Sequence, residues 1–428
     1  MHFLIKYVII ILIVFLKGYS EMANIAILGY GVVGSGAVEV LTQNKNIIEA
    51  KTGEAASIKY ILDLREFPGD KFEHLVVHDF NIIINDPEID IVAEMMGGSH
   101  PAYDFSKACL EAGKSVVTSN KEVVANFGAE LLEIAKAHGV SYMFEASVGG
   151  GIPVIRPMIR DLSSNNINEV SGILNGTTNY ILTKMDTEGA DFADVLRDAQ
   201  KKGYAEANPA ADVEGLDAAR KIVILAALSY GKLINPKNIH TEGITTITRD
   251  DVDSARRLGY AIKLIGHTEK LDGKILAMVS PRLVPAYNPL SAISDVFNGI
   301  LVNGDMVGDV MFYGPGAGKL PTASAVCADI VDIMSHKEKP LKAPEWTCAN
   351  DDDVADFSDY SCRRMFIFAT PCEKCAEKCI KDNLEGKIVD KVFKDGKLYA
   401  IVENMTEADA LSLMENATFK CEKFIRVL

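Results

Sequence analysis

The chain of 428 residues is too long for one ordinary domain, and typical domain sizes suggest about three units. Its composition, 48% apolar and 24% charged, is that of a soluble globular protein. The formal net charge of −15 argues against a nucleic-acid-binding protein, which needs a concentrated basic surface, and against docking on an anionic membrane.

The N-terminus carries an apolar run, residues 7–16, between Lys6 and Lys17. The run is shorter than the roughly 20 apolar residues of a membrane-spanning helix, and no small-x-small cleavage site of a signal peptide follows it. Met22 directly precedes a predicted buried strand. We therefore expect Met22 to be the true start, residues 1–21 to be an upstream extension of the reading frame, and the protein to be cytoplasmic; export is the less favoured alternative.

Short apolar runs alternate with amphipathic stretches in residues 22–150, and this alternation predicts a Rossmann-type α/β domain with a parallel sheet. The expected strands are residues 24–28, 58–62, 89–95, 115–118 and 140–144, and the expected helices are residues 32–41 and 103–112.

The segment 151–334 has fewer strand–helix repeats and indicates an α+β catalytic and dimerisation domain. Its expected helices are residues 191–201, 216–230 and 250–258, and its expected strands are residues 170–174, 275–279 and 282–284. A helix over 320–334 is expected to return to the first domain. Residues 335–357 indicate a linker, and residues 358–428 a small ferredoxin-like module of β-α-β-β-α-β order.

A glycine-rich turn follows the first predicted strand and opens the first predicted helix. It matches the pattern G-x-G-x-x-G, in which glycines allow a tight turn, close approach of a pyrophosphate, and close packing of helix on strand. The free N–H groups at the helix start suit phosphate oxygens. The candidate dinucleotide-binding residues are Gly29, Tyr30, Gly31, Val32, Val33 and Gly34.

Two residues after the second predicted strand favour different cofactors. Asp63 could accept a hydrogen bond from the ribose 2′-hydroxyl of NAD, whereas Arg65 could pair with the 2′-phosphate of NADP. We favour NADP slightly, because Arg65 lies where the turn opens outward; either residue could instead face solvent.

Ser119 and Lys121 directly follow the strand 115–118, at the sheet edge where ligands of open α/β sheets bind. Lys121 could reach a substrate near the nicotinamide. Equally, it could be an ordinary lysine at a helix start, paired with Glu122.

Asp217 and Lys221 are four residues apart, hence on one face of the predicted helix 216–230. Such a lysine could exchange a proton with an alcohol oxygen, and Glu206, Asp212 and Asp217 could hold a substrate ammonium group. The alternative is an ordinary helix salt bridge beside a solvated acidic loop.

Five collinear segments between Asn24 and Asp332 resemble homoserine dehydrogenases. They are GYGVVGSG, SNKEVVA, EASVGGGIPVI, ILNGTTNYIL and GYAEANPAADVEGLDAARK. The resemblance implies reversible NAD(P)-dependent reduction of L-aspartate 4-semialdehyde to L-homoserine, in threonine, methionine and isoleucine biosynthesis, by a homodimer or homotetramer. A non-catalytic nucleotide-binding regulator on the same fold is the alternative.

The resemblance also implies roles for single residues. Lys221 would be the acid/base group, Lys121 a second lysine between cofactor and substrate, and Glu206 and Asp217, with Asp212 close by, would bind the amino group. Gly203 and Gly318 would line the cofactor and substrate cleft. Main-chain carbonyls of four residues would hold a sodium or potassium ion, unless the segment is a plain turn: Glu145, Val148, Gly150 and Ile152.

Many family members end in an ACT module that senses an amino-acid effector such as threonine. Residues 360–428 are short for this module and lack its usual turn, since Thr370-Pro371-Cys372 stands there. Cys372, Cys375 and Cys379 repeat along one helical stripe. We interpret this stripe as core rather than as a metal or redox site.

Overall fold

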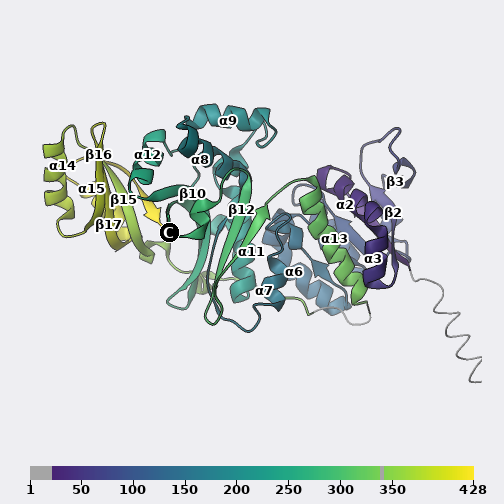
Figure 1. The fold of residues 1–428 in the computed structure, drawn as a ribbon. Coiled ribbons are helices and arrows are strands. Elements are labelled where there is room, and N and C mark those ends of the chain that lie inside the picture. The colour runs from purple at the N-terminus through teal and green to yellow at the C-terminus, as the bar shows by residue number, and fades with distance from the viewer. Residues whose placement is uncertain (1–21, 338–341) are drawn as a thin grey trace, which may run out of the picture. The chain divides into compact units, whose positions relative to one another are not determined.

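The computed structural model describes residues 22–337 and 342–428, so the prediction for residues 1–21 falls outside the described part (Figure 1). The chain divides into two compact units. Of the described residues, the first comprises 22–123, 127–151, 318–337 and 342–345, and the second comprises 124–126, 152–317 and 346–428. Among the described helices, none has both the length and the apolar character needed to cross a membrane.

The first unit is built on a six-stranded parallel sheet with the strand order β3-β2-β1-β4-β5-β6. The strands are β1 (Met22–Leu28), β2 (Ala55–Leu62), β3 (Val76–Val77), β4 (Ile91–Glu94), β5 (Ser115–Thr118) and β6 (Tyr142–Met143). Strand β1 is apolar from Ile25 to Leu28, because this part of the strand is buried on both faces. The predicted α/β architecture is confirmed.

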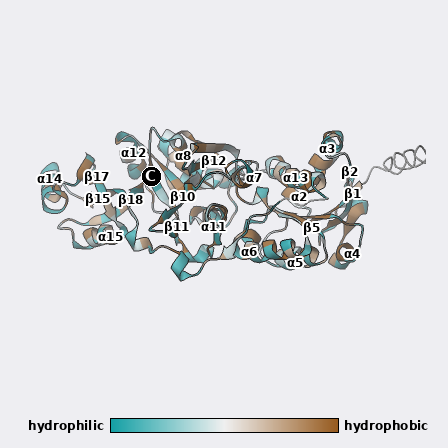
Figure 2. Cartoon of the chain, turned by 90° about the horizontal axis from the view of Figure 1, so that it is seen from below, coloured by the Kyte–Doolittle hydropathy of each residue, from teal (hydrophilic) through white to brown (hydrophobic). Residues whose placement is uncertain are grey.

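Helices cover both faces of this sheet. They are α2 (Val32–Gln43), α3 (Lys45–Thr52), α4 (Phe80–Ile84), α5 (Ala102–Glu111), α6 (Lys121–His138) and α13 (Lys319–Ser335), with short 3-10 turns η1 (Glu73–Leu75) and η2 (Glu145–Ser147). Figure 2 shows α2 and α13 on one side of the strands and α4, α5 and α6 on the other. Helix α13 packs against α2, and a Cβ on Gly36 would lie 2.8 Å from Lys319 O.

Three helices of the first unit were not predicted, namely α3, α4 and α6. The insert after Asn44 forms α3, which ends at Gly53 in the left-handed conformation. Helix α6 begins directly at Lys121, with the Asn120 side chain accepting hydrogen bonds from the N–H groups of Glu122 and Val123.

The second unit contains a mixed sheet with the order β13-β12-β7-β10-β11-β18-β15-β17-β16, and β9 pairs with β11. Its strands up to residue 348 are β7 (Ile167–Ile173), β8 (Lys232–Leu233), β9 (His240–Thr241), β10 (Tyr260–Leu271), β11 (Lys274–Pro285), β12 (Phe297–Gly304), β13 (Gly308–Pro315) and β14 (Thr347–Cys348). Strands β10, β12 and β13 were not predicted. The two predicted strands 275–279 and 282–284 are one continuous strand, β11.

The helices of this unit up to residue 359 are α7 (Ile155–Arg160), α8 (Gly176–Glu188), α9 (Phe192–Lys201), α10 (Ala210–Val213), α11 (Leu216–Tyr230) and α12 (Arg249–Arg257), with short turns η3 (Pro236–Asn238), η4 (Pro289–Ala292), η5 (Asp351–Asp353) and η6 (Phe357–Asp359). Helix α11 packs against the sheet: a Cβ on Gly266 of β10 would lie 3.3 Å from Ile222 Cβ.

The C-terminal segment has the predicted β-α-β-β-α-β order. Its elements are β15 (Ser361–Ala369), α14 (Glu373–Cys379), the π-turn η7 (Ile380–Leu384), β16 (Ile388–Lys394), β17 (Lys397–Thr406), α15 (Glu407–Asn416) and β18 (Cys421–Val427). The segment is not a separate unit, however. Its edge strand β18 pairs in parallel with β11, so the two sheets are continuous.

The prediction that residues 335–357 form a linker is wrong for the second half of this range, residues 346–357. Trp346 is buried, β14 pairs with β8, and Val354 forms a bridge with Ile275. Prolines and acidic residues there mark turns rather than a free connection, because tertiary contacts satisfy the backbone groups.

Candidate active site

The glycine-rich turn of the first unit has the geometry that a dinucleotide needs. Gly29 has a φ of +92°, and a Cβ there would lie 2.9 Å from Met95 O; a Cβ on Gly34 would lie 1.9 Å from Gly29 O. A Cβ on Gly31, in contrast, would meet no atom within 4 Å. The first and third glycines are therefore required by packing, whereas Gly31 leaves space for close approach of a phosphate to the backbone.

The start of α2 fits the same ligand. Gly31 is the N-cap and offers no side-chain cap to the first-turn N–H groups, which suits phosphate oxygens. Tyr30 is buried, whereas Val32 is exposed. The residues of this turn therefore fit a nicotinamide dinucleotide.

Asp63 and Arg65, predicted as alternatives, bind each other. The Arg65 guanidinium donates to both carboxylate oxygens of Asp63, at 2.9–3.0 Å, and the Tyr30 N–H donates to Asp63 Oδ2 at 2.8 Å. The hydrogen bonds from Arg65 hold the pKa of Asp63 well below its usual range. The Arg65 side chain is 62% exposed. Asp63 thus anchors the glycine turn and Arg65 together.

A buried carboxyl, Glu94, joins the ends of β4 and β5. It accepts hydrogen bonds from Thr118 Oγ1 (2.6 Å), from the Met96 N–H (2.7 Å) and from Asn120 Nδ2 (3.4 Å). Burial raises the pKa of Glu94 to about 7. The Ser119 N–H donates to Glu94 O. This network fixes the turn that carries Ser119 and Lys121, and sequence reasoning missed Glu94 because it lies inside an apolar run.

The lysine and acidic residues of the second unit form a buried cluster. Lys221 Nζ donates to Asp217 Oδ2 and to Leu174 O, both at 2.7 Å, and the Asp217 and Lys221 residues are 4% and 7% exposed. The predicted placement of Asp217 and Lys221 on one face of the helix is confirmed, and the two side chains form a salt bridge. This salt bridge is buried, unlike that of an ordinary exposed helix surface.

Asn175 connects this cluster to Asp212. Its side-chain amide donates to Asp212 Oδ1 at 2.7 Å and to Asp217 Oδ2 at 3.0 Å, while its oxygen caps α8 at the Thr178 N–H. Only Leu174 separates Asn175 from the end of β7, so Asn175 links the strand, the N-terminus of α8 and the cluster. The segment ILNGTTNYIL pointed to this position without giving Asn175 a role.

Glu206 and Gly203 lie in the exposed loop before α10. Gln200 Nε2 donates to the main-chain oxygen of Glu206 at 3.1 Å, but the Glu206 carboxylate has no hydrogen-bond or ion-pair partner among the described residues. Gly203 has a φ of +74°, which favours glycine. The structure thus brings together Asp212, Asp217 and Lys221 but not the Glu206 side chain.

The residues expected at the cation loop lie in a buried turn. The Glu145 N–H donates to Asp329 Oδ2 at 2.9 Å, Val148 and Ile152 are buried, and Gly150 has a φ of +58°. A Cβ on the neighbouring Gly151 would lie 2.7 Å from Pro321 Cβ, so packing alone accounts for one glycine of this run. Gly318 is the N-cap of α13 and has a φ of +122°.

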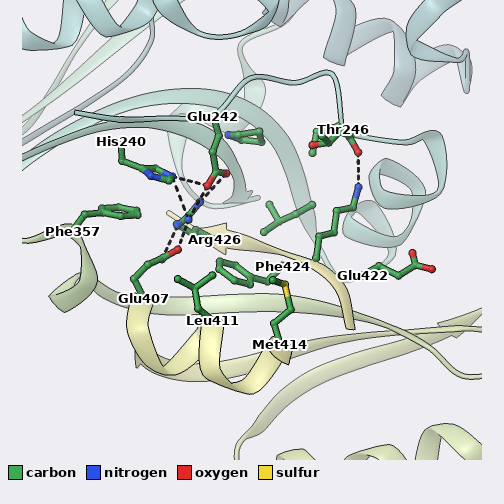
Figure 3. A pocket seen from close by; sticks show the side chains of 14 residues that line it. His240, Glu242, Thr246, Phe357, Glu407, Leu411, Met414, Glu422, Phe424 and Arg426 are labelled. Carbon is green, nitrogen blue, oxygen red and sulfur yellow. Dashed lines mark hydrogen bonds and ion pairs between the residues drawn. The ribbon is translucent and has the colours of Figure 1, made fainter. Parts of the chain in front are cut away.

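A cavity of about 400 Å³ lies in the second unit where β18 joins β11. Figure 3 shows Arg426 between Glu242 and Glu407, with Leu411, Met414 and Phe424 along the wall. Arg426 donates to Glu242 Oε1 at 2.9 Å and to Glu407 Oε1 at 2.6 Å. The cavity therefore offers both signs of charge beside apolar groups.

Comparisons with known proteins agree on one family. Two family models match, "Homoserine dehydrogenase, NAD binding domain" over residues 29–145 and "Homoserine dehydrogenase" over residues 153–331. The homoserine dehydrogenase of Bacillus subtilis is 42% identical over 316 residues, covering 73% of each chain. That of Helicobacter pylori is 42% identical over 334 residues, covering 76% of this chain and 78% of the relative.

Solved structures extend the likeness to the C-terminal segment. The homoserine dehydrogenase of Thiobacillus denitrificans is 35% identical, with a TM-score of 0.85, and the match covers 95% of this chain and 98% of that one. A hyperthermophilic archaeal homoserine dehydrogenase in complex with NADPH is 27% identical, with a TM-score of 0.63, over 75% of this chain and 99% of that one. The non-catalytic alternative is not favoured by these matches, and the chain, with its dinucleotide-type glycine turn and buried lysine cluster, belongs to the NAD(P)-dependent homoserine dehydrogenases.

Proposed function

We propose that Lys221 is the acid/base group through which the chain interconverts L-aspartate 4-semialdehyde and L-homoserine. The observation that carries the proposal is the position of Nζ, which is buried between Asp217 Oδ2 and Leu174 O at the start of an apolar helix. A group held in this way can take the proton of the homoserine hydroxyl, or return it to the alkoxide formed from the aldehyde. Its orientation is set before substrate binds, which lowers the entropic cost of proton transfer.

The substrate amino group would be bound by Asp217 and Glu206, with Asp212 close by. The spacing supports this assignment, because Asn175 holds two carboxylates at 2.7 and 3.0 Å from one amide nitrogen. The exposed Glu206 carboxylate is available to a substrate ammonium group.

The cofactor would be held by the turn Gly29–Gly34, by Ser119 and by Lys121, with Gly203 and Gly318 lining the cleft. A bound nicotinamide dinucleotide supplies or accepts the hydride. NADP is favoured over NAD, because the Arg65 guanidinium is exposed and can donate to a 2′-phosphate. Lys121 would act as the second lysine of the reaction.

Three further expectations of the family belong to the proposal. A sodium or potassium ion would bind the carbonyl oxygens of Glu145, Val148, Gly150 and Ile152. The active form would be a homodimer or homotetramer. An amino-acid effector such as threonine would bind in the cavity around Arg426, where charged groups of both signs lie. Inhibition kinetics with threonine test whether the effector binds.

Steady-state kinetics of Lys221→Ala in both directions test the central assignment. We expect kcat to fall by about 10²–10⁴-fold, the usual contribution of a positioned acid/base group, with the Kd of NADPH unchanged. Lys237→Ala, which removes an exposed lysine of the same unit, is the matched control. A Lys221→Ala protein that is folded and retains more than a tenth of kcat would contradict the proposal.

The double variant Lys221→Met/Asp217→Asn separates catalysis from folding, since it removes both charges of the buried pair together. A folded double variant should bind NADPH normally and turn over as slowly as Lys221→Ala. Recovered turnover in the double variant would show that Lys221 acts only by neutralising Asp217.

A further inference from the structure

Two strands of the second unit bring three metal-binding side chains together away from the lysine cluster. The register of β7 and β10 pairs Ser171 with His267 and Glu169 with Glu269. Residues directly opposite in an antiparallel pair lie on one face of the sheet. One carboxylate oxygen from each glutamate and one ring nitrogen of His267 lie within 4.8 Å of one another.

The His267 ring is oriented as a ligand would be. The residue is 3% exposed, and Nδ1 lies 2.8 Å from Ser171 Oγ. Nε2 is buried, has no hydrogen-bond partner among the described residues, and faces Glu269 Oε1 at 3.6 Å.

The two carboxylates need a positive partner. Like charges directly opposite across a strand pair are destabilising. The Glu169 carboxylate has no hydrogen-bond or ion-pair partner within residues 22–337 and 342–428.

The buried Arg282 acts on this cluster only from a distance. Its guanidinium donates to Tyr360 OH and contacts Met278 Sδ, both at 2.8 Å, and it forms no ion pair with a carboxylate of the described residues. Its positive charge will weaken the binding of any cation without replacing it.

We propose that Glu169, His267 and Glu269 form a binding site for a divalent transition-metal ion of the zinc class, which clamps β7 to β10. Ligands about 2.1 Å from a tetrahedral zinc ion lie about 3.4 Å from each other, close to the 3.6 Å between His267 Nε2 and Glu269 Oε1. A ring nitrogen beside two carboxylates favours zinc over calcium or magnesium, which prefer oxygen ligands alone. Ser171 would fix the ring as an outer partner.

The role of the ion is structural and does not depend on the dehydrogenase mechanism. Strand β7 leads directly into Leu174 and Asn175, which contact Lys221 and Asp217. An ion bound between β7 and β10 would therefore stabilise the strand that positions the lysine cluster. The half-buried glutamates keep the site accessible to ions from solvent.

The test is titration of the full-length, metal-free protein with Zn²⁺, followed by calorimetry and thermal unfolding. Cys372 and Cys375 could also bind zinc, so the titration is done in the Cys372→Ser/Cys375→Ser background. We expect one ion per chain and a higher Tm with zinc. Glu169→Gln and Glu269→Gln should each weaken binding at least tenfold and abolish the rise in Tm, whereas Glu415→Gln, an exposed matched control, should change neither.

Cobalt provides an independent readout of the ligands. In the same background, Co²⁺ should give the absorption of a low-coordinate nitrogen–oxygen site, which Ser171→Ala weakens by about 10–100-fold in affinity and His267→Gln removes. The proposal is overturned if zinc does not bind the folded protein, or if Glu169→Gln and Glu269→Gln bind it as tightly as the parent does.

Discussion

Glu94 illustrates how one buried side chain couples stability to pH. Its pKa is raised from 4.5 to about 7 by burial, so the folded state binds the proton more tightly than the unfolded chain does. The contribution of Glu94 to the free energy of unfolding is therefore fully present below pH 4.5 and is lost as the pH rises through about 7. At about 1.4 kcal/mol per pKa unit, the 2.5-unit difference corresponds to about 3 kcal/mol.

Glu94→Gln should remove this dependence, because glutamine has the shape of the protonated carboxyl and does not titrate. We expect the variant to lose less free energy of unfolding than the parent between pH 5 and pH 8, by up to about 3 kcal/mol. Urea unfolding at a series of pH values measures the difference. Parallel pH profiles for the two proteins would show that Glu94 stays ionised when folded.

We expect the single residue Arg65 to determine the preference for NADPH over NADH. Arg65→Ala is expected to raise the Kd of NADPH by about 10–100-fold, the range of one or two charge-assisted hydrogen bonds, and to leave that of NADH nearly unchanged. Fluorescence titration with both dinucleotides checks this, with Lys71→Ala as a control for loss of positive charge in the same loop region. An equal loss for NADH and NADPH would assign Arg65 to the loop structure alone.

At the scale of elements, helix α14 shows how a regular pattern can divide between two environments. The predicted cysteine stripe has its last member, Cys379, in the core of the C-terminal segment, as expected. Cys372, in contrast, is exposed, so the interpretation of the whole stripe as core is wrong for this residue. Cys372 caps the helix, and its Sγ lies 2.7 Å from that of Cys375. A hydrogen bond from Cys375 lowers the pKa of the Cys372 thiol.

This arrangement predicts selective oxidation. Mild oxidants should convert Cys372 and Cys375 into an intrachain disulfide and leave Cys379 reduced, because a buried thiol is protected. Peptide mass spectrometry measures the pairing, and Cys372→Ser should abolish it whereas Cys348→Ser should not. A disulfide that contains Cys379 would be incompatible with the burial described here.

At the scale of the whole molecule, the C-terminal segment is joined to the second unit by charge as well as by strand pairing. Arg426 and Arg364 both donate to Glu407, and Arg426 also donates to Glu242. The two arginines are almost fully buried, so each depends on its carboxylate partner.

Arg426→Met should therefore destabilise the second unit by about 3–5 kcal/mol, the usual cost of leaving one member of a buried ion pair without its partner. Urea unfolding and limited proteolysis between β15 and β18 measure the effect. Arg363→Met is the matched control, since its ion pair with Glu403 is exposed and such pairs contribute about 0–1 kcal/mol. An unchanged midpoint for Arg426→Met would mean that strand pairing alone joins the segment.

The sequence by itself determined those features that depend on neighbours along the chain. The strand–glycine–helix order at Gly29, the placement of Asp217 and Lys221 on one helix face, and the β-α-β-β-α-β order of the last segment all follow from local periodicity and spacing. Local propensity and helix geometry decide such features before any distant contact forms.

Only the tertiary structure decided which distant groups meet. Leu174 O meets Lys221 across 47 positions of the chain, and Asn175 meets Asp217 across 42. The Asp63 carboxylate accepts hydrogen bonds from Arg65 and Tyr30, and β18 pairs with β11 where a linker and a separate module were predicted. The physical reason is that burial, strand register and the need to satisfy every buried polar group are settled by the whole fold, and no short stretch of sequence contains that information.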